Sequence, residues 1–224
     1  GEVKIKVKAT ALNRLDLYTR AGGRGLDREF PPPLILGGDC AGEVVEIGDG
    51  VTTLKAGDRV VVNPRISCMQ CAACLAGQDD LCRSESFLGS GVDGSYAEFV
   101  SVPAVNAHLL ADSVSFEQAA AAPTTYLPVW NMLVRKLQLK SWQTVLVLSA
   151  SAGVGVAAIQ VAKDIIGAKV IATTSSPDRQ IGRRLGILLG QGVVIAAAFL
   201  IPNVLFVFLQ TDKEWQLSST WKLV

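Results

Sequence analysis

Four of the five cysteines fall in one short segment, with the spacing C-x2-C-x2-C-x7-C at Cys68, Cys71, Cys74 and Cys82. Thiolates are soft ligands, and four of them close a tetrahedral zinc site with no position left for water or substrate. The spacing predicts one structural zinc ion per chain, held by a loop at about residues 64–84. Two disulfides are the alternative, favoured by short secreted domains. The fifth cysteine, Cys40, lies in an apolar segment and is interpreted as a small core residue.

A second segment suited to chemistry is the small-residue run SASAGVG at residues 149–155. It lies between an apolar run typical of a buried parallel strand (144–148) and a predicted helix (153–166). Small residues let the backbone approach a pyrophosphate, and the helix N-terminus supplies N–H donors. The strict G-x-G-x-x-G spelling is absent, so a tight turn without a ligand is the alternative. The candidate cofactor-binding residues are Ala150, Ser151, Ala152, Gly153, Val154 and Gly155.

The end of the following predicted strand, residues 169–173, bears on the choice of cofactor. An acidic residue there favours NAD, whereas this chain has Thr174 and Ser175, with Arg179 shortly after. Hydroxyls and a guanidinium suit a 2′-phosphate, so these three residues favour NADPH over NADH. The alternative is that the same polar residues only cap the next helix.

The elements that must position these residues divide the chain into two parts. Residues 3–8 alternate apolar and lysine side chains, and residues 42–48, 59–62 and 96–100 also predict strands separated by Gly/Asp turns. Short strands of this kind predict a small barrel or sandwich. From residue 113 a capping box at Ser115 predicts a helix toward Lys136, interrupted or kinked at Pro123 and Pro128. The strand, helix and strand that follow predict one βαβ unit.

The composition excludes one broad class of partner. The chain has 21 Lys and Arg against 20 Asp and Glu, a formal net charge of +1, with no basic cluster. Such a surface has no electrostatic footprint for nucleic acid. Half of the residues are hydrophobic, which is ample for a core. Thiols kept as metal ligands imply a reducing compartment, so a cytoplasmic location is expected.

Taken in order, these segments resemble the medium-chain dehydrogenase/reductase superfamily. The matching segments are GGDCAGEV (37–44), AGDRV (56–60), the four cysteines and residues 145–155. The resemblance implies an α+β and α/β chain, with a GroES-like β-barrel domain at 1–112 and a partial Rossmann domain at 113–186. It also implies an active site in the cleft between the two domains, and Thr125 as a nicotinamide contact. A dimer or tetramer is expected if the whole domain is present.

The resemblance also distinguishes two chemical branches. Zinc alcohol dehydrogenases place a cysteine ligand at Asn13, a histidine ligand at Gly38, a glutamate at Asp39 and a third ligand near Thr124, with a proton-relay hydroxyl at Leu15. None of the three ligands is present, and a catalytic zinc needs three. We therefore expect no zinc-assisted alcohol oxidation.

The segment 13–18 has the form N-x-x-D-x-Y, which resembles the quinone oxidoreductases of the zeta-crystallin-like branch. In that branch hydride passes between NADPH and a quinone or an α,β-unsaturated carbonyl without a metal. The candidate catalytic residues are Asn13, to orient substrate or nicotinamide, Asp16, to hold the loop through backbone amides, and Tyr18, to donate a proton or stack. The alternatives are a turn residue for Asn13 and packing for Tyr18. The single histidine, His108, is expected to have a packing or surface role.

The resemblance stops near residue 185, before a charge-free run at 187–209. Three explanations are open for the tail at 187–224: a truncated gene product, a membrane anchor with Arg183 and Arg184 on the cytoplasmic side, or a substitute β-unit. Membrane association is not the favoured one. Accordingly, three functional hypotheses remain: an NADPH-dependent reductase of small carbonyl or quinone substrates, a catalytically silent zinc-stapled fragment, and a zinc-dependent alcohol dehydrogenase.

Overall fold

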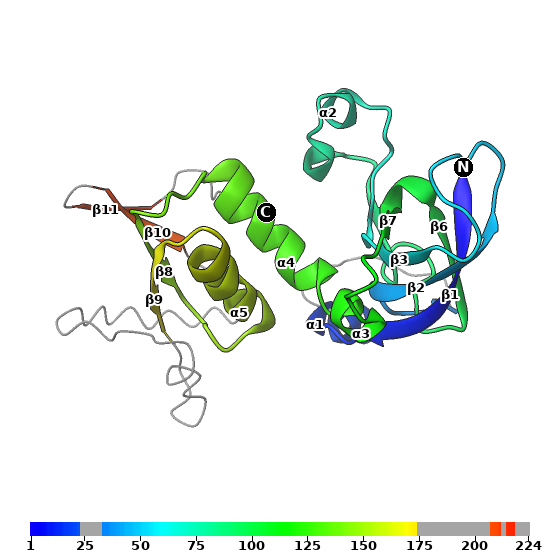
Figure 1. Cartoon of the computed structure of the whole chain (residues 1–224), viewed down its shortest axis with the longest axis horizontal. Helices are drawn as coiled ribbons and strands as arrows, with labels where there is room; N and C mark the ends of the chain where they lie inside the picture. Colours follow the sequence, from blue (N-terminus) through cyan, green and yellow to red (C-terminus); the bar gives the residue numbers. More distant parts are fainter. Residues whose placement is uncertain (23–32, 174–206, 212–213, 218–224) are drawn as a thin grey trace. The chain divides into compact units, whose positions relative to one another are not determined.

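A computed structural model describes residues 1–22, 33–173, 207–211 and 214–217 (Figure 1). The chain divides into two compact units, Gly1–Thr124 and Thr125–Val224. This division lies later in the chain than the predicted boundary at 112/113. The reason is the helix α3 (Phe116–Ala120), whose Ala119 and Ala120 form a small buried cluster with Ala41 of the first unit.

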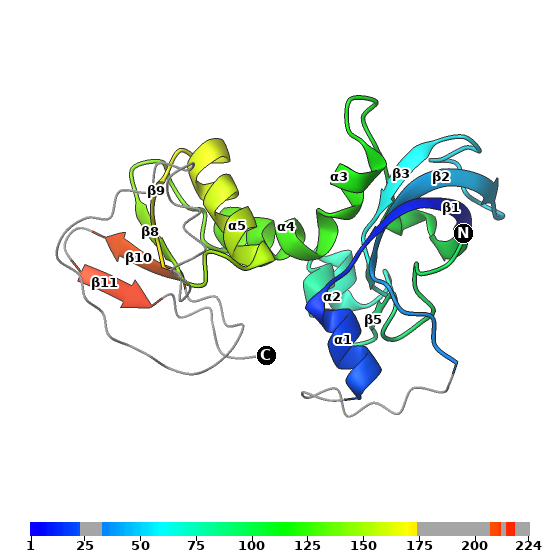
Figure 2. The ribbon, with the colours of Figure 1, turned by 90° about the horizontal axis from the view of Figure 1, so that it is seen from below.

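The first unit is built on a five-stranded antiparallel sheet in the order β6-β1-β2-β3-β7 (Figures 1 and 2). Two shifts of register along β1 bend the pairing of β1 with β2. The sheet confirms the predicted strands at 3–8, 42–48 and 59–62. The strands are β1 (Glu2–Ala11), β2 (Asp39–Ile47), β3 (Arg59–Val62), β6 (Phe99–Pro103) and β7 (Ala107–Leu109).

The alternation that predicts β1 is also what builds the core of this unit. Val3 and Ile5 are buried, while the lysines between and after them reach solvent. Cys40 is completely buried among the same apolar side chains, so its interpretation as a core residue is confirmed. Burial raises the pKa of the Cys40 thiol to about 12.

The return strand predicted at 96–100 is placed wrongly by a few residues. Strand β6 begins at Phe99, and the backbone before it pairs elsewhere: the N–H groups of Ser95 and Tyr96 donate to the carbonyls of Gly37 and Leu36. This pairing fixes Tyr96 beside the start of β2. The apolar pattern of the segment gives no sign of it.

The cysteine-bearing segment extends from the barrel between β3 and β6 (Figure 1). It begins and ends in a two-stranded sheet, where Arg65 pairs with Phe87. Its elements are β4 (Arg65–Ile66), α2 (Ala72–Leu75), the 3-10 helix η1 (Asp79–Leu81) and β5 (Ser86–Phe87).

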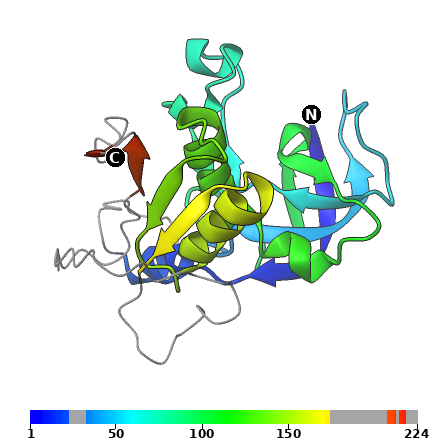
Figure 3. The ribbon, with the colours of Figure 1, turned by 60° about the vertical axis from the view of Figure 1, so that its left-hand side comes forward.

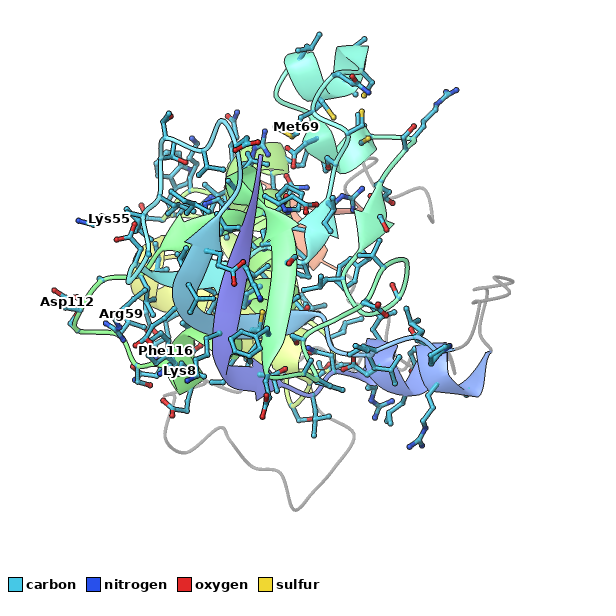
Figure 4. The ribbon with its side chains drawn as sticks, turned by 90° about the vertical axis from the view of Figure 1, so that its right-hand side faces the viewer. Lys8, Lys55, Arg59, Met69, Asp112 and Phe116 are labelled. Atoms are coloured by element: carbon cyan, nitrogen blue, oxygen red, sulfur yellow. The ribbon has the colours of Figure 1, made fainter. Side chains whose placement is uncertain are left out.

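The side chain of Arg59 fixes the loop that leads to α3. Arg59 on β3 lies over the ring of Phe116 at 4.6 Å and donates to the carbonyl of Val114 at 2.7 Å. Figure 4 shows Arg59 close to both Phe116 and Asp112. The segment that follows the 3-10 turn η2 (Ala104–Asn106) and β7 is thus held against the barrel. It ends at Ser115, whose side chain caps α3 as predicted.

The second unit contains the predicted βαβ arrangement. Strands β8 (Thr144–Val147) and β9 (Lys169–Ala172) are parallel, and the helix between them is α5 (Gly153–Gln160), extended by the π-helical turn η4 (Val161–Ile165). Figure 3 shows this helix lying across one face of the two strands. Before them run α4 (Pro123–Trp130) and η3 (Asn131–Lys136). The helix predicted toward Lys136 is therefore interrupted before Pro123, whereas Pro128 lies inside α4.

The other edge of β8 is covered by a hairpin from the tail. Strand β10 (Val207–Thr211) pairs antiparallel with β8, and β11 (Glu214–Leu217) pairs with β10, giving the order β11-β10-β8-β9 (Figure 2). This pairing does not decide among the three explanations for the tail, which stay predictions. Residues 187–206 lie outside the described residues. Within the part that is described, no helix has the length and apolar character needed to cross a membrane.

Candidate functional site

The structure brings the four predicted zinc ligands together. The Sγ atoms of Cys68, Cys71, Cys74 and Cys82 all lie within 4.8 Å of one another. The Sγ atom of Cys74 is 3.5 Å from that of Cys71 and 3.9 Å from that of Cys68. Four sulfurs bound at about 2.3 Å to a tetrahedral zinc ion stand about 3.8 Å apart, so the donor set fits this metal. The five cysteines are all free thiols, which does not agree with the disulfide alternative.

The backbone around Cys68 favours its thiolate. Backbone N–H groups of Gln70 and Cys71 hold the pKa of the Cys68 thiol below its usual value, at about 6. The N–H of Cys68 in turn lies 3.4 Å from Sγ of Cys82. Met69, which follows Cys68, adopts a positive φ of 57°, and this backbone turn brings the N–H groups of Gln70 and Cys71 toward the sulfur of Cys68. Burial raises the pKa of Cys74, so a cation is what permits four thiolates together.

Polar contacts hold this loop together and tie it to the barrel. Arg65 donates to the carbonyl of Asp80 at 2.7 Å and forms an ion pair with Glu85. The side chain of Asn106, which is buried, donates to the carbonyls of Asn63 and Arg65. These bonds fix the two ends of the loop, while the cysteines face one another inside it.

A second group of polar side chains lies where α1 (Arg14–Ala21) follows β1. Asn13 is the residue that caps this helix, and Oδ2 of Asp16 accepts the backbone N–H of Asn13 at 2.7 Å. Asp16 is buried and also accepts the hydroxyl of Tyr96 at 2.9 Å. Asp16 thus holds the loop through a backbone amide, in agreement with the interpretation from the sequence. Burial of Tyr96 raises the pKa of its hydroxyl, and the carboxylate of Asp16 raises it further.

Asp39 is the centre of this group. It is 1% exposed, and its carboxylate accepts from three donor groups: Nδ2 of Asn13 at 2.8 Å, Oγ1 of Thr124 at 2.7 Å and the N–H of Thr124 at 3.1 Å. Burial raises the pKa of Asp39, although the bonds from Thr124 and Asn13 oppose that rise. Asp39 is the first residue of β2 and is followed directly by the small apolar residues Cys40 and Ala41, which is a sequence sign of a buried, bonded carboxylate.

The third catalytic candidate, Tyr18, and the single histidine, His108, are not among the donors to Asp39 described above. Tyr18 is a half-buried residue of α1, and its predicted role stays a prediction. His108 is exposed on β7, opposite Val61, which agrees with a surface role. Tyr96 was absent from the predicted site. It is found only through its contacts, because its ring packs against Gly37 and its hydroxyl reaches Asp16.

In the second unit, the predicted phosphate-binding turn connects β8 to α5. Ala152 precedes the helix without a side-chain cap, so the first N–H groups of α5, from Gly153 and Val154, have no partner within the helix. Ser149 adopts a positive φ of 57°, and the N–H of Ala150 donates to the carbonyl of Thr173 at the end of β9. The turn can therefore receive an anion.

Two neighbours shape this turn. Gly155 is buried against the carbonyl of Ser149, where a side chain would overlap it. Thr125 lies beside the turn, since a Cβ on Gly153 would stand 3.0 Å from its methyl group. The structure thus places Thr125 with the turn residues. The remaining cofactor residues predicted from the sequence, Thr174, Ser175 and Arg179, lie outside the described residues.

Comparison with known proteins identifies the family. Residues 1–112 match the family described as alcohol dehydrogenase GroES-like domain. The L-threonine 3-dehydrogenase of Francisella tularensis subsp. novicida is 34% identical over 174 residues, which are 78% of this chain and 48% of the relative. The chain thus spans about half the length of the curated relatives it matches.

Solved structures give the same result. The crystal structure of an NAD-dependent alcohol dehydrogenase has a TM-score of 0.76 and 44% identity, covering 83% of this chain and 54% of that one. A cobalt- and zinc-bound thermostable alcohol dehydrogenase from Pyrobaculum aerophilum has a TM-score of 0.73 and 34% identity, covering 84% and 56%. This chain therefore belongs to the alcohol dehydrogenase GroES-like family, within the medium-chain dehydrogenase/reductase superfamily.

Proposed function

We propose that this chain acts in an NADPH-dependent oxidoreductase that transfers hydride between the nicotinamide and a quinone or an α,β-unsaturated carbonyl, without a catalytic zinc. Dehydrogenase relatives support the general class of reaction. The finer proposal, on metal and substrate, rests on the residues of this chain.

The observation that supports it best is the set of hydrogen bonds around Asp39. Asn13, Asp39 and Thr124 stand at the positions where the resemblance places metal-binding or metal-neighbouring side chains. Here an amide, a carboxylate and a hydroxyl bind one another instead. An amide and a hydroxyl are poor ligands for zinc, which takes thiolate, imidazole and carboxylate. Polarisation of a substrate carbonyl then falls to hydrogen-bond donors.

The four cysteines are proposed to hold the single, structural zinc ion. With four thiolates the coordination is closed, so the ion contributes to the folding of the loop and takes no part in hydride transfer. The bond from Arg65 to Asp80 then joins two parts of the folded loop, and the bonds from Asn106 join its first end to the barrel.

The turn from β8 to α5 is proposed to hold the pyrophosphate of the dinucleotide. The N–H groups of Gly153 and Val154 point out of the helix N-terminus, and the small side chains of Ala150, Ser151 and Ala152 leave its approach open. The bound nicotinamide supplies the hydride. Thr125, next to the turn, is proposed as a cofactor contact, and Thr174, Ser175 and Arg179 as contacts that favour NADPH.

The first experiment is a titration of the purified, zinc-loaded chain with NADPH, with NADH as the comparison, followed by nicotinamide fluorescence. Saturable binding that is tighter for NADPH, and weaker after Arg179→Ala, is expected. Oxidation of NADPH is then measured with a quinone and an enone. A folded chain that binds neither nucleotide would contradict the proposal and favour the catalytically silent fragment.

A zinc-dependent alcohol dehydrogenase is the second candidate, because the alcohol dehydrogenase with 44% identity favours it. Zinc content separates the two. We expect one zinc per chain, and none in a Cys68→Ser/Cys71→Ser double variant. Retention of one zinc by that variant, together with alcohol oxidation, would favour this second candidate.

A further inference from the structure

The hydrogen bonds of Asp39 determine which atoms of Asn13 face it. An ionised carboxylate has only acceptor atoms, so the group of Asn13 that lies 2.8 Å from Oδ2 of Asp39 must be the amide nitrogen. The other carboxylate oxygen of Asp39 accepts from Thr124, through both its hydroxyl and its N–H. One carboxylate oxygen of Asp39 is therefore fixed by Thr124, and the other orients the amide of Asn13.

The oxygen of the same amide also has a place. Asn13 and Asp16 form a capping box, in which the side chain of Asn13 faces the backbone N–H of Asp16 at the start of α1. The bond to Asp39 assigns the amide: one hydrogen of Nδ2 faces Asp39. Oδ1 then lies on the capping-box side, where the N–H of Asp16 donates to the backbone carbonyl of Asn13 at 3.2 Å. The second hydrogen of Nδ2 has no such partner among the described residues, and it is the donor that remains for a ligand.

We propose that Asp39 is a positioning residue, which holds Asn13 in the amide orientation that presents this N–H donor to the oxygen of a substrate carbonyl. The proposal rests on the proposed function, since it takes the substrate to be a quinone or an enone. Such an oxygen gains negative charge as hydride is added, and a fixed donor stabilises that charge. Thr124 takes part by fixing Asp39.

A purely structural role for Asp39 makes a different prediction. If Asp39 only connects β2 to the start of α4, its replacement would lower the free energy of unfolding. It would change neither the amide orientation of Asn13 nor the rate of hydride transfer. The two roles are separated by a signal of the Asn13 side chain itself, and by a split between kcat and KM.

The test compares Asp39→Asn with the unsubstituted, zinc-loaded chain. Asparagine keeps the size of the side chain but turns an amide toward at least one of the three donors. The control is Asp58→Asn, an aspartate of the same unit that accepts the N–H of Lys55 at 2.9 Å and lies outside these contacts. The side-chain amide signals of Asn13 are assigned by nuclear magnetic resonance from their loss in Asn13→Asp.

With Asp39→Asn we expect the Asn13 amide signals to shift and their hydrogens to exchange faster with solvent. We also expect kcat for NADPH oxidation to fall by on the order of 100-fold, as for loss of one oxyanion donor, with a smaller change in KM. Asp58→Asn is expected to leave both unchanged. If Asp39→Asn does not fold, Thr124→Val, which keeps the carboxylate, is expected to shift the same signals by a smaller amount.

A folded Asp39→Asn chain with unchanged Asn13 signals and unchanged kcat would overturn the proposal. So would unchanged signals in Thr124→Val where Asp39→Asn does not fold. Shifted signals in a chain whose unsubstituted form oxidises no NADPH would overturn the proposed function and the donor role. That result would still support the orientation of Asn13 by Asp39, so the two failures are distinguishable.

Discussion

The carbonyl oxygen of Ser149 occupies the place where a side chain on Gly155 would begin. Ser149 itself has a positive φ, so its carbonyl turns back under the first turn of α5. This close approach sets the helix N-terminus directly against the end of β8. The glycine at 155 is therefore required by packing, whereas the exposed Gly153 is not.

Replacing Gly155 by alanine is expected to push α5 away from the turn. The cost of overpacking is about 1–3 kcal/mol of unfolding free energy, and binding of NADPH should weaken because the N–H donors move with the helix. Thermal unfolding followed by circular dichroism, and nucleotide titration, measure the two effects. Gly153→Ala is the matched control: its new methyl group meets only the Thr125 methyl, at 3.0 Å. Equal losses of unfolding free energy in the two variants would contradict the packing argument.

The cysteines allow a second prediction. Cys82→Ser removes one sulfur from a buried position and should abolish stoichiometric zinc binding, while Cys40→Ala, which changes a core thiol, should keep one zinc per chain. Metal analysis after dialysis gives the content, and the rate of thiol modification gives the exposure of the remaining cysteines. Zinc retained in Cys82→Ser, or lost in Cys40→Ala, would show that the four-sulfur assignment is wrong.

Most of the local structure was predictable because its signals are local. The alternation of apolar residues and lysines predicts β1, the capping box at Ser115 predicts the start of α3, and the cysteine spacing predicts the cluster. The apolar run at 144–148 and its glycine turn likewise predict the parallel pair β8 and β9. Each of these signals comes from residues close together in the chain.

What the sequence did not predict depends on long-range pairing. Asp39 and Thr124 are far apart in the chain, and only the packing of α3 on the barrel brings them within 2.7 Å. Tyr96 pairs with Leu36 rather than continuing β6, for a reason that the strand pattern does not contain. The antiparallel pairing of β10 with β8 likewise appears only when the partner strand is known.

Tyr96 gives a third prediction. Its hydroxyl donates to the buried carboxylate of Asp16, so Tyr96→Phe leaves that acceptor with one bond fewer. Hydrogen bonds to charged groups contribute about 1.5–3 kcal/mol, and urea unfolding should show a loss of this order. The matched control is Tyr126→Phe, since the Tyr126 hydroxyl donates to Gln160 at an exposed position. A larger loss in the control would contradict the importance of the Asp16 contact.

The buried carboxyl of Asp39 predicts how stability depends on pH. Burial raises its pKa above the ordinary value of 3.8 in the folded chain. At a pH between 3.8 and the raised pKa, the folded chain binds a proton that the unfolded chain does not. The stabilisation that this proton gives the folded chain is therefore fully present below pH 3.8 and is lost as the pH rises through the raised pKa.

Thr124→Val removes a donor that lowers the pKa of Asp39, so in this variant the stability should continue to fall up to a higher pH. Urea unfolding of both chains from neutral pH to about pH 4 measures it, with Thr125→Val as the control. We expect the stability deficit of Thr124→Val to shrink as the pH falls, because protonation removes the buried charge that the hydroxyl stabilises; a deficit that grows on acidification would refute the role given to burial.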